Sequence, residues 1–120
     1  MENHFFFLLG LAFILVHEMD AVRSREWAIF PLLSRLDENT GYYVFTALHV
    51  PLYLLLFWSL FSTGELNRSL VIGLDIFFIV HVFLHLLFSK NPRNDFKSKF
   101  SWVIMLGSGI AGLLDLVVGF

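Results

Sequence analysis

Four long apolar segments, separated by short polar stretches, are the feature of this sequence that most constrains its fold. They cover residues 5–22, 42–61, 69–88 and 100–120. Each has about 18–21 residues, a length that as helix matches the roughly 30 Å hydrocarbon core of a bilayer. The segments are too long for barrel strands and show no two-residue alternation, which leaves helices as the membrane-spanning structure.

Composition supports the same class of fold. The chain has 120 residues, 58% of them hydrophobic and 15% charged, and a soluble domain of this size cannot bury so much apolar surface. We therefore predict an all-α polytopic membrane protein whose residues 1–120 form a single four-transmembrane-helix bundle. Membrane lipid is its expected partner, and the formal net charge of −2 argues against nucleic acid.

The connections between the segments differ in character. Residues 62–68 form a turn short enough to make the second and third segments an antiparallel hairpin, and residues 89–99 are rich in turn-forming residues. In the longest connection, residues 23–41, large apolar side chains recur at helical spacing. We predict that this connection contains a short amphipathic helix in the membrane interface, interrupted near Pro31. The apolar side chains are Trp27, Phe30, Leu33 and Leu36.

The basic residues are divided unequally between the two ends of the predicted bundle. Arg68 lies between the second and third segments, whereas the other seven of the eight basic residues lie in connections 23–41 and 89–99. The positive-inside rule predicts that these two connections are cytoplasmic and that both termini are outside, in an inner (cytoplasmic) membrane. The first segment lacks a basic leader and a small-residue cleavage site, so we expect it to be a retained helix.

Ionisable residues inside the spans are the candidates for function, because a charged group in the bilayer costs from about 2.5 kcal/mol upward. Closing the hairpins brings histidines of three helices to one depth in the cytoplasmic half of the bundle. Two of them are four residues apart and project from one helix face, so both can bind one ion. The predicted metal ligands are His17, His49, His81 and His85.

Carboxylates accompany these histidines. Asp20 is three residues from His17 and can face the same interior, whereas Glu18 points about 100° away around the helix axis. The chain has no cysteine, so the donors are histidine and carboxylate, a set that suits zinc, iron, manganese or copper. Glu26 lies beyond the membrane boundary; it could fold back over the site, but an ordinary solvated glutamate is the preferred interpretation. Structural packing of the histidines is the alternative to metal binding.

Three classes of function remain open. The first is a metalloenzyme, in which histidines hold zinc or iron and leave a position for water, whose pKa falls to about 7. Asp20 or Glu18 would then be the general base in the hydrolysis of a lipidic amide or ester. The second is a haem-binding, pigment-binding or other redox subunit with two histidines as axial ligands. The third is a non-catalytic accessory subunit or sensor of a membrane complex.

Two further polar or small-residue features lie in the second half of the chain. Asp75 and Asp115 share a depth near the opposite face of the bilayer. We interpret them as a structural pair, with cation binding or proton relay as alternatives. The fourth segment contains small-xxx-small pairs, which allow another helix to approach closely, either within the monomer or in a homodimer. The small residues concerned are Gly107, Ser108, Ala111 and Gly112.

Three strings follow one another in the first half of the chain. They are His17-Glu18-Met19-Asp20-Ala21, Glu26-Trp27 with Pro31 nearby, and His49-Val50-Pro51. In these strings the chain resembles a family of small uncharacterised bacterial four-helix membrane proteins, which implies the same fold but no activity. The site alone is also similar to the zinc sites of seven-helix hydrolases of the alkaline ceramidase and adiponectin-receptor type. Those sites combine HxxxH on one helix with a histidine on another and nearby carboxylates.

Overall fold

The computed structural model describes residues 4–29, 32–90 and 98–119, and these fold into four long helices. All four are long and apolar enough to cross a membrane, and the described residues contain no strand. The predicted all-α, four-helix architecture is therefore confirmed. The helices are α1 (Phe5–Arg23), α2 (Glu38–Phe61), α3 (Arg68–Leu87) and α4 (Lys99–Val118).

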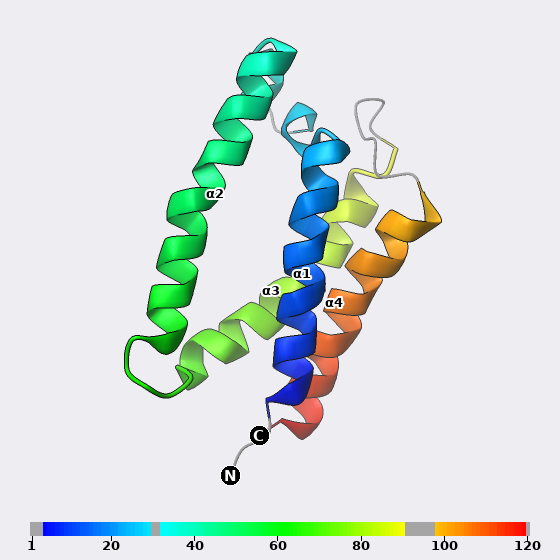
Figure 1. The fold of residues 1–120 in the computed structure, drawn as a ribbon. Helices are drawn as coiled ribbons and strands as arrows, with labels where there is room; N and C mark the ends of the chain where they lie inside the picture. The colour runs from blue at the N-terminus through cyan, green and yellow to red at the C-terminus, as the bar shows by residue number, and fades with distance from the viewer. Residues whose placement is uncertain (1–3, 30–31, 91–97, 120) are drawn as a thin grey trace.

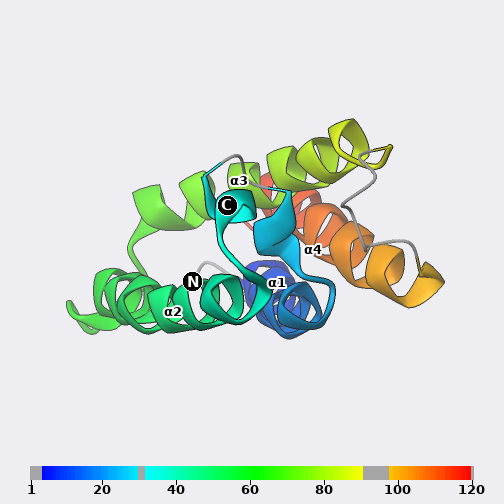
Figure 2. The same ribbon diagram turned by 90° about the horizontal axis from the view of Figure 1, so that it is seen from above.

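Helices α1, α3 and α4 form the packed part of the molecule, and α2 diverges from it (Figures 1 and 2). The three residues that α2 buries lie at its two ends: Gly41 and Phe45 near its start, and Leu60 near its end. Figure 1 shows the start of α2 beside the connection that follows α1, at what we call the connection end. The two termini lie together at the opposite, terminal end.

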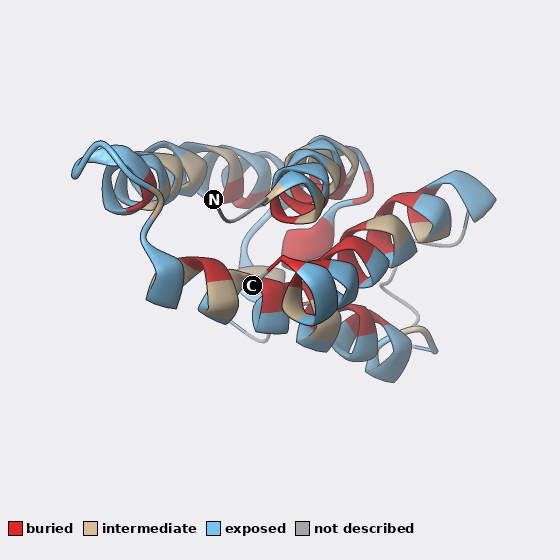
Figure 3. Ribbon diagram, turned by 90° about the horizontal axis from the view of Figure 1, so that it is seen from below, coloured by how far each residue is buried: buried red, intermediate tan, exposed pale blue. Residues whose placement is uncertain are grey.

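The buried apolar side chains form two clusters, one toward each end of the bundle. In Figure 3 the buried positions, drawn in red, lie mainly where the helices face one another. The cluster at the terminal end contains Phe7 and Phe78, whose rings stack with centroids 6.3 Å apart. The cluster at the connection end is built around Trp27 and Met105. His17 lies along α1 between these two clusters. Because it is fully buried, its side chain faces the interior of the packed helices.

The small residues of α4 face the neighbouring helices of the same chain. A Cβ added at Gly107 would lie 2.9 Å from the ring of Phe13, and one added at Gly112 would lie 2.8 Å from the carbonyl oxygen of Asp75. Close packing of α4 against α1 and α3 thus accounts for these glycines within the monomer. The homodimer contact through the same residues stays a prediction.

Helix α2 begins at Glu38, earlier than the apolar segment that starts at Tyr42. The cause is Asp37, whose side chain accepts a hydrogen bond from the Thr40 backbone N–H at 3.4 Å and so caps the helix. The hydrogen bonds from Thr40 hold the pKa of the Asp37 carboxyl below its ordinary value. Hydropathy alone overlooks this polar first turn.

The connection between α1 and α2 contains two short 3₁₀ turns, η1 (Glu26–Ala28) and η2 (Leu33–Arg35), in place of the expected amphipathic helix. Phe30 and Pro31 lie outside the described residues. Directly after α1, Arg25 adopts the left-handed conformation (φ 54°), which is costly for a residue with a Cβ. This sharp change of direction turns the η1 residues back against the helices, and all three are buried there.

Candidate metal centre

Three histidines and one glutamate converge at the connection end. Each offers one ligand atom, and the four atoms lie within 4.8 Å of one another. We call these residues, His17, Glu26, His81 and His85, the tetrad. Helix α1 supplies the first, η1 the second, and α3 the two last. The structure thus brings together three of the four histidines predicted as ligands.

The distances within the tetrad are close to those expected around one small cation. Two donor atoms at about 2.0–2.2 Å from a tetrahedral ion are roughly 3.3–3.6 Å apart. The Nε2 atoms of His81 and His85 are 3.1 Å apart, and the Nε2 atom of His85 is 3.5 Å from Oε1 of Glu26. The Nε2 atom of His17 is 4.0 Å from the same oxygen, so closure around an ion requires only a small movement.

The rings of the three histidines meet edge to face. The centroid of the His17 ring is 4.6 Å from that of His81 and 5.0 Å from that of His85, with interplanar angles of 72° and 83°. Stacked rings would place their nitrogen atoms side by side. The crossed rings instead allow one nitrogen of each imidazole to face a shared point, as coordination requires.

The tetrad is almost completely buried. His17 has 0% of its surface exposed, and the other three members have less than a tenth exposed. Nδ1 of His81 is buried and has no hydrogen-bond partner among the described residues. Burial of polar groups is costly unless a partner satisfies them, and Nε2 of His81 has such a partner in Nε2 of His85, 3.1 Å away.

Glu26 is the residue that the sequence reasoning misjudged. Its interpretation as a solvated glutamate is wrong, because the residue is only 9% exposed and its carboxylate lies against His85. The reason is the chain reversal at Arg25, which no periodicity reveals. The sequence does contain a signal: Glu26 is followed directly by Trp27-Ala28-Ile29, an apolar string that is itself buried and carries the carboxylate inward with it.

His49 lies apart from the tetrad and forms a pair with Glu18. Its Nε2 atom is 2.5 Å from Oε2 of Glu18, and its Nδ1–H donates to the carbonyl oxygen of Phe45 at 2.7 Å. A carbonyl can only accept, so Nδ1 carries a proton, and the contact between Nε2 and Oε2 must hold a second one. We call these two residues the Glu18–His49 pair.

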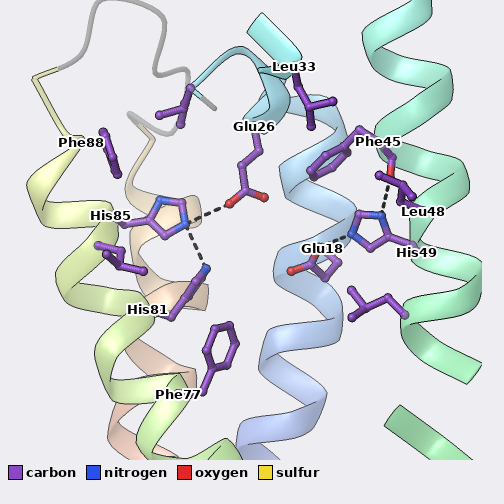
Figure 4. A pocket seen from close by; sticks show the side chains of 13 residues that line it. Glu18, Glu26, Leu33, Phe45, Leu48, His49, Phe77, His81, His85 and Phe88 are labelled. Carbon is purple, nitrogen blue, oxygen red and sulfur yellow. Dashed lines mark hydrogen bonds and ion pairs between the residues drawn. The ribbon is translucent and has the colours of Figure 1, made fainter. Parts of the chain in front are cut away.

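A cavity of about 440 Å³ separates the tetrad from the Glu18–His49 pair. Glu26, His81 and His85 line one side of it, and the pair lines the other (Figure 4). Its volume and its apolar lining with few polar groups are typical of small-molecule binding sites. The apolar lining residues are Ile29, Leu33, Phe45, Leu48, Leu52, Phe77, Leu84 and Phe88.

Asp20, the other predicted general base, is neither a member of the tetrad nor one of the residues that line this cavity. It is half-buried near the end of α1. Glu18 does line the cavity, so of the two predicted bases it has access to a molecule bound there. The catalytic roles of both stay predictions.

The second ionisable cluster lies at the terminal end. Asp75 and Asp115 are fully buried beside each other, and neither oxygen of Asp75 has a hydrogen-bond partner among the described residues. Oδ1 of Asp115 also accepts a hydrogen bond from the Phe7 backbone N–H at 3.1 Å, and its Oδ2 is 3.6 Å from Nδ1 of His4. Helix α1 has no capping side chain at its own N-cap position, so Asp115 supplies one from α4. This geometry suits a structural role.

The chain belongs to the family of unknown function DUF6713, whose model matches residues 3–120. No curated protein and no solved structure matches the chain. The family agrees with the resemblance to an uncharacterised family. The bacterial origin of the chain and the similarity to ceramidase-type sites stay predictions.

Proposed function

We propose that this protein is a membrane metalloenzyme that binds one divalent metal ion, zinc or iron, through the tetrad. The observation that carries the proposal is the convergence of four buried ligand atoms, from α1, α3 and η1, within 4.8 Å of one another. Three imidazoles and a carboxylate are the donor set that these two metals accept. Chance burial of four polar side chains at one point between apolar helices is costly, so a bound ion is the simplest reason for it.

The arrangement favours an ion over haem. A porphyrin supplies four coplanar nitrogen atoms and leaves the protein two positions on opposite faces of the ring. In the tetrad, His81 and His85 project from the same face of α3 with their Nε2 atoms 3.1 Å apart, and His17 faces both rings. Two ligands so close on one side cannot be the two axial ligands of one haem.

We further propose that the reaction is hydrolysis of a lipid ester or amide. The three histidines hold the metal ion, which when bound activates water and polarises the substrate carbonyl. Glu26 is the one carboxylate of the tetrad and lines the cavity, so we assign it as the ligand that would act on an entering water molecule. Its carboxylate accepts a proton from that water as the water oxygen bonds to the carbonyl carbon. Glu26 returns this proton to the leaving oxygen or nitrogen as the carbon–oxygen or carbon–nitrogen bond breaks, which gives a carboxylic acid and an alcohol or amine.

Metal content tests the binding step. Wild-type protein, purified gently and reloaded with zinc or ferrous iron, should contain about one ion per chain. His85→Ala should contain almost none, although its helical circular dichroism is unchanged, because insertion depends on the apolar spans. Asp75→Asn, a change of a fully buried group at the terminal end, is the control and should keep its metal. Wild-type protein that takes up no ion would overturn the proposal.

Glu26→Gln tests the chemical step, since the amide has the same shape but cannot accept the proton. We expect hydrolysis of an acyl amide or ester in proteoliposomes to fall by about 10²–10⁴-fold, with metal binding retained in part. Incorporation of one oxygen atom from labelled water into the released acid would identify hydrolysis. Release of acid without the label would contradict it.

A further inference from the structure

The cavity opens at the outer surface of the bundle, between α2 and α3. Leu52 of α2 is 54% exposed and Leu84 of α3 is 44% exposed, yet both line the cavity. A side chain that lines a cavity and is also half exposed marks its mouth. Both residues lie in spans whose exposed faces contact hydrocarbon in a membrane, so this mouth opens to lipid.

The lining of the cavity consists of a long apolar surface and two groups of polar side chains. The apolar side chains of α2 and α3 form most of the lining, whereas the tetrad and the Glu18–His49 pair face each other across it (Figure 4). Sites of this kind bind an apolar body and use their few polar groups to orient it. The matching ligand has a hydrocarbon chain and a compact polar group at one end.

The Glu18–His49 pair specifies that polar group further. Oε2 of Glu18 is bonded to His49, and the carboxyl group has a second oxygen with lone pairs of its own. That oxygen is directed toward the space between α1 and α3 in Figure 4. An acceptor at this point suits an N–H or O–H donor close to the carbonyl group of the ligand.

We propose that the cavity binds the acyl chain of a fatty amide or hydroxy-ester that enters sideways from the membrane between α2 and α3. The chain lies along Leu48, Leu52 and Phe77, the carbonyl faces the tetrad, and the adjacent N–H or O–H donates to Glu18. This inference rests on the proposed function, because the tetrad must hold its metal ion to bind the carbonyl. It adds the substrate class, the route of entry and a binding role for Glu18.

A steric block in the cavity separates chain binding from metal binding. The probes are two hydroxamates, which chelate metal ions: acetohydroxamate without a chain, and decanohydroxamate with one. The protein is loaded with Co²⁺, held in lipid nanodiscs, and titrated while its visible absorption is followed. The variant Leu52→Trp fills the cavity. Leu55→Trp, on the same helix but not in the cavity lining and 67% exposed, is the matched control.

We expect Leu52→Trp to weaken the binding of decanohydroxamate by about tenfold or more and to leave the affinity for acetohydroxamate unchanged. Leu55→Trp should leave the affinities for both probes unchanged. Because the nanodisc lipid is the same for all proteins, partitioning of the decanoyl chain into lipid affects every titration equally and cancels in the comparison. Equal effects of the two tryptophans on the long probe would overturn the inference while the metal site stands. A wild-type protein with no Co²⁺ absorption would instead overturn the proposed function, and the inference with it.

Discussion

Two buried clusters of ionisable side chains occupy opposite ends of the same helices, and they differ in what their polar atoms face. At the terminal end, Oδ1 of Asp115 accepts a hydrogen bond from a backbone N–H of α1, so this oxygen caps a helix of the same chain. At the connection end, the tetrad directs ring nitrogens and a carboxylate oxygen at one point. Neither aspartate lines the cavity, whereas three members of the tetrad do.

This difference separates burial that the fold explains from burial that a bound ion would explain. Both clusters carry the cost of removing polar groups from water. The aspartate cluster recovers part of it through helix capping by Asp115, which requires no other molecule. In the tetrad, the Nε2 atoms of His81 and His85 are 3.1 Å apart, within hydrogen-bond distance and close to the separation of two ligands on one ion.

The largest expected effect on metal affinity comes from comparing a substitution in the tetrad with one in the aspartate cluster. His81→Ala should lower metal affinity by more than about 100-fold, because loss of a ligand costs more than loss of an outer partner. Asp115→Ala should leave metal affinity unchanged but lower the free energy of unfolding by about 1–3 kcal/mol, since the Phe7 N–H loses its acceptor. Metal titration and unfolding in mixed detergent measure the two quantities. If Asp115→Ala lost metal as completely as His81→Ala, the two clusters would not be functionally distinct.

An intermediate effect is expected at Gly41, whose nearest packing neighbour is the indole of Trp27. A Cβ added there would lie 2.6 Å from Cδ1 and Nε1 of Trp27, which is too close for the indole to keep its place. Displacing Trp27 shifts its neighbour Glu26, so Gly41→Ala should weaken metal binding by about tenfold. Gly73→Ala is the matched control, because nothing lies within 4 Å of the added Cβ. Equal metal affinity in the two variants would show that η1 does not position Glu26.

Much of the fold follows from the sequence because hydropathy and helix length are local properties. The bounds of α1, α3 and α4 agree with the apolar segments to within one or two residues, the usual uncertainty of helix ends. Helix α2 begins early because Asp37 caps a polar first turn that hydropathy does not register. The orientation of the bundle in the membrane stays a prediction from the basic residues.

The candidate site was predictable where it depends on helix register and not where it depends on the connection. His81 and His85 are four residues apart on one helix, and closing the hairpins brings His17 to their depth. Glu26 joins them because Arg25 adopts a left-handed backbone conformation that reverses the chain. A single left-handed residue produces no periodic pattern in the sequence, so this reversal could not be predicted. His49 was placed at the right depth, but the divergence of α2 from the packed helices puts a cavity between it and the tetrad.

The smallest effect on metal affinity is expected for His49→Gln. This variant tests whether a histidine at the same depth as the tetrad also binds the metal ion. If all four histidines bound the metal, removing His49 would release it as removing His81 does. In the structure His49 bonds to Glu18 and to the Phe45 carbonyl, and it is no member of the tetrad. We therefore expect metal affinity within about twofold of wild type, since the hydrogen bonds of His49 go to Glu18 and to the Phe45 carbonyl rather than to a member of the tetrad. Competition with a chelator of known affinity measures this. A loss of 100-fold or more, equal to that in His81→Ala, would mean that α2 closes onto α3 when the ion binds, and the cavity would then be a feature of the metal-free protein alone.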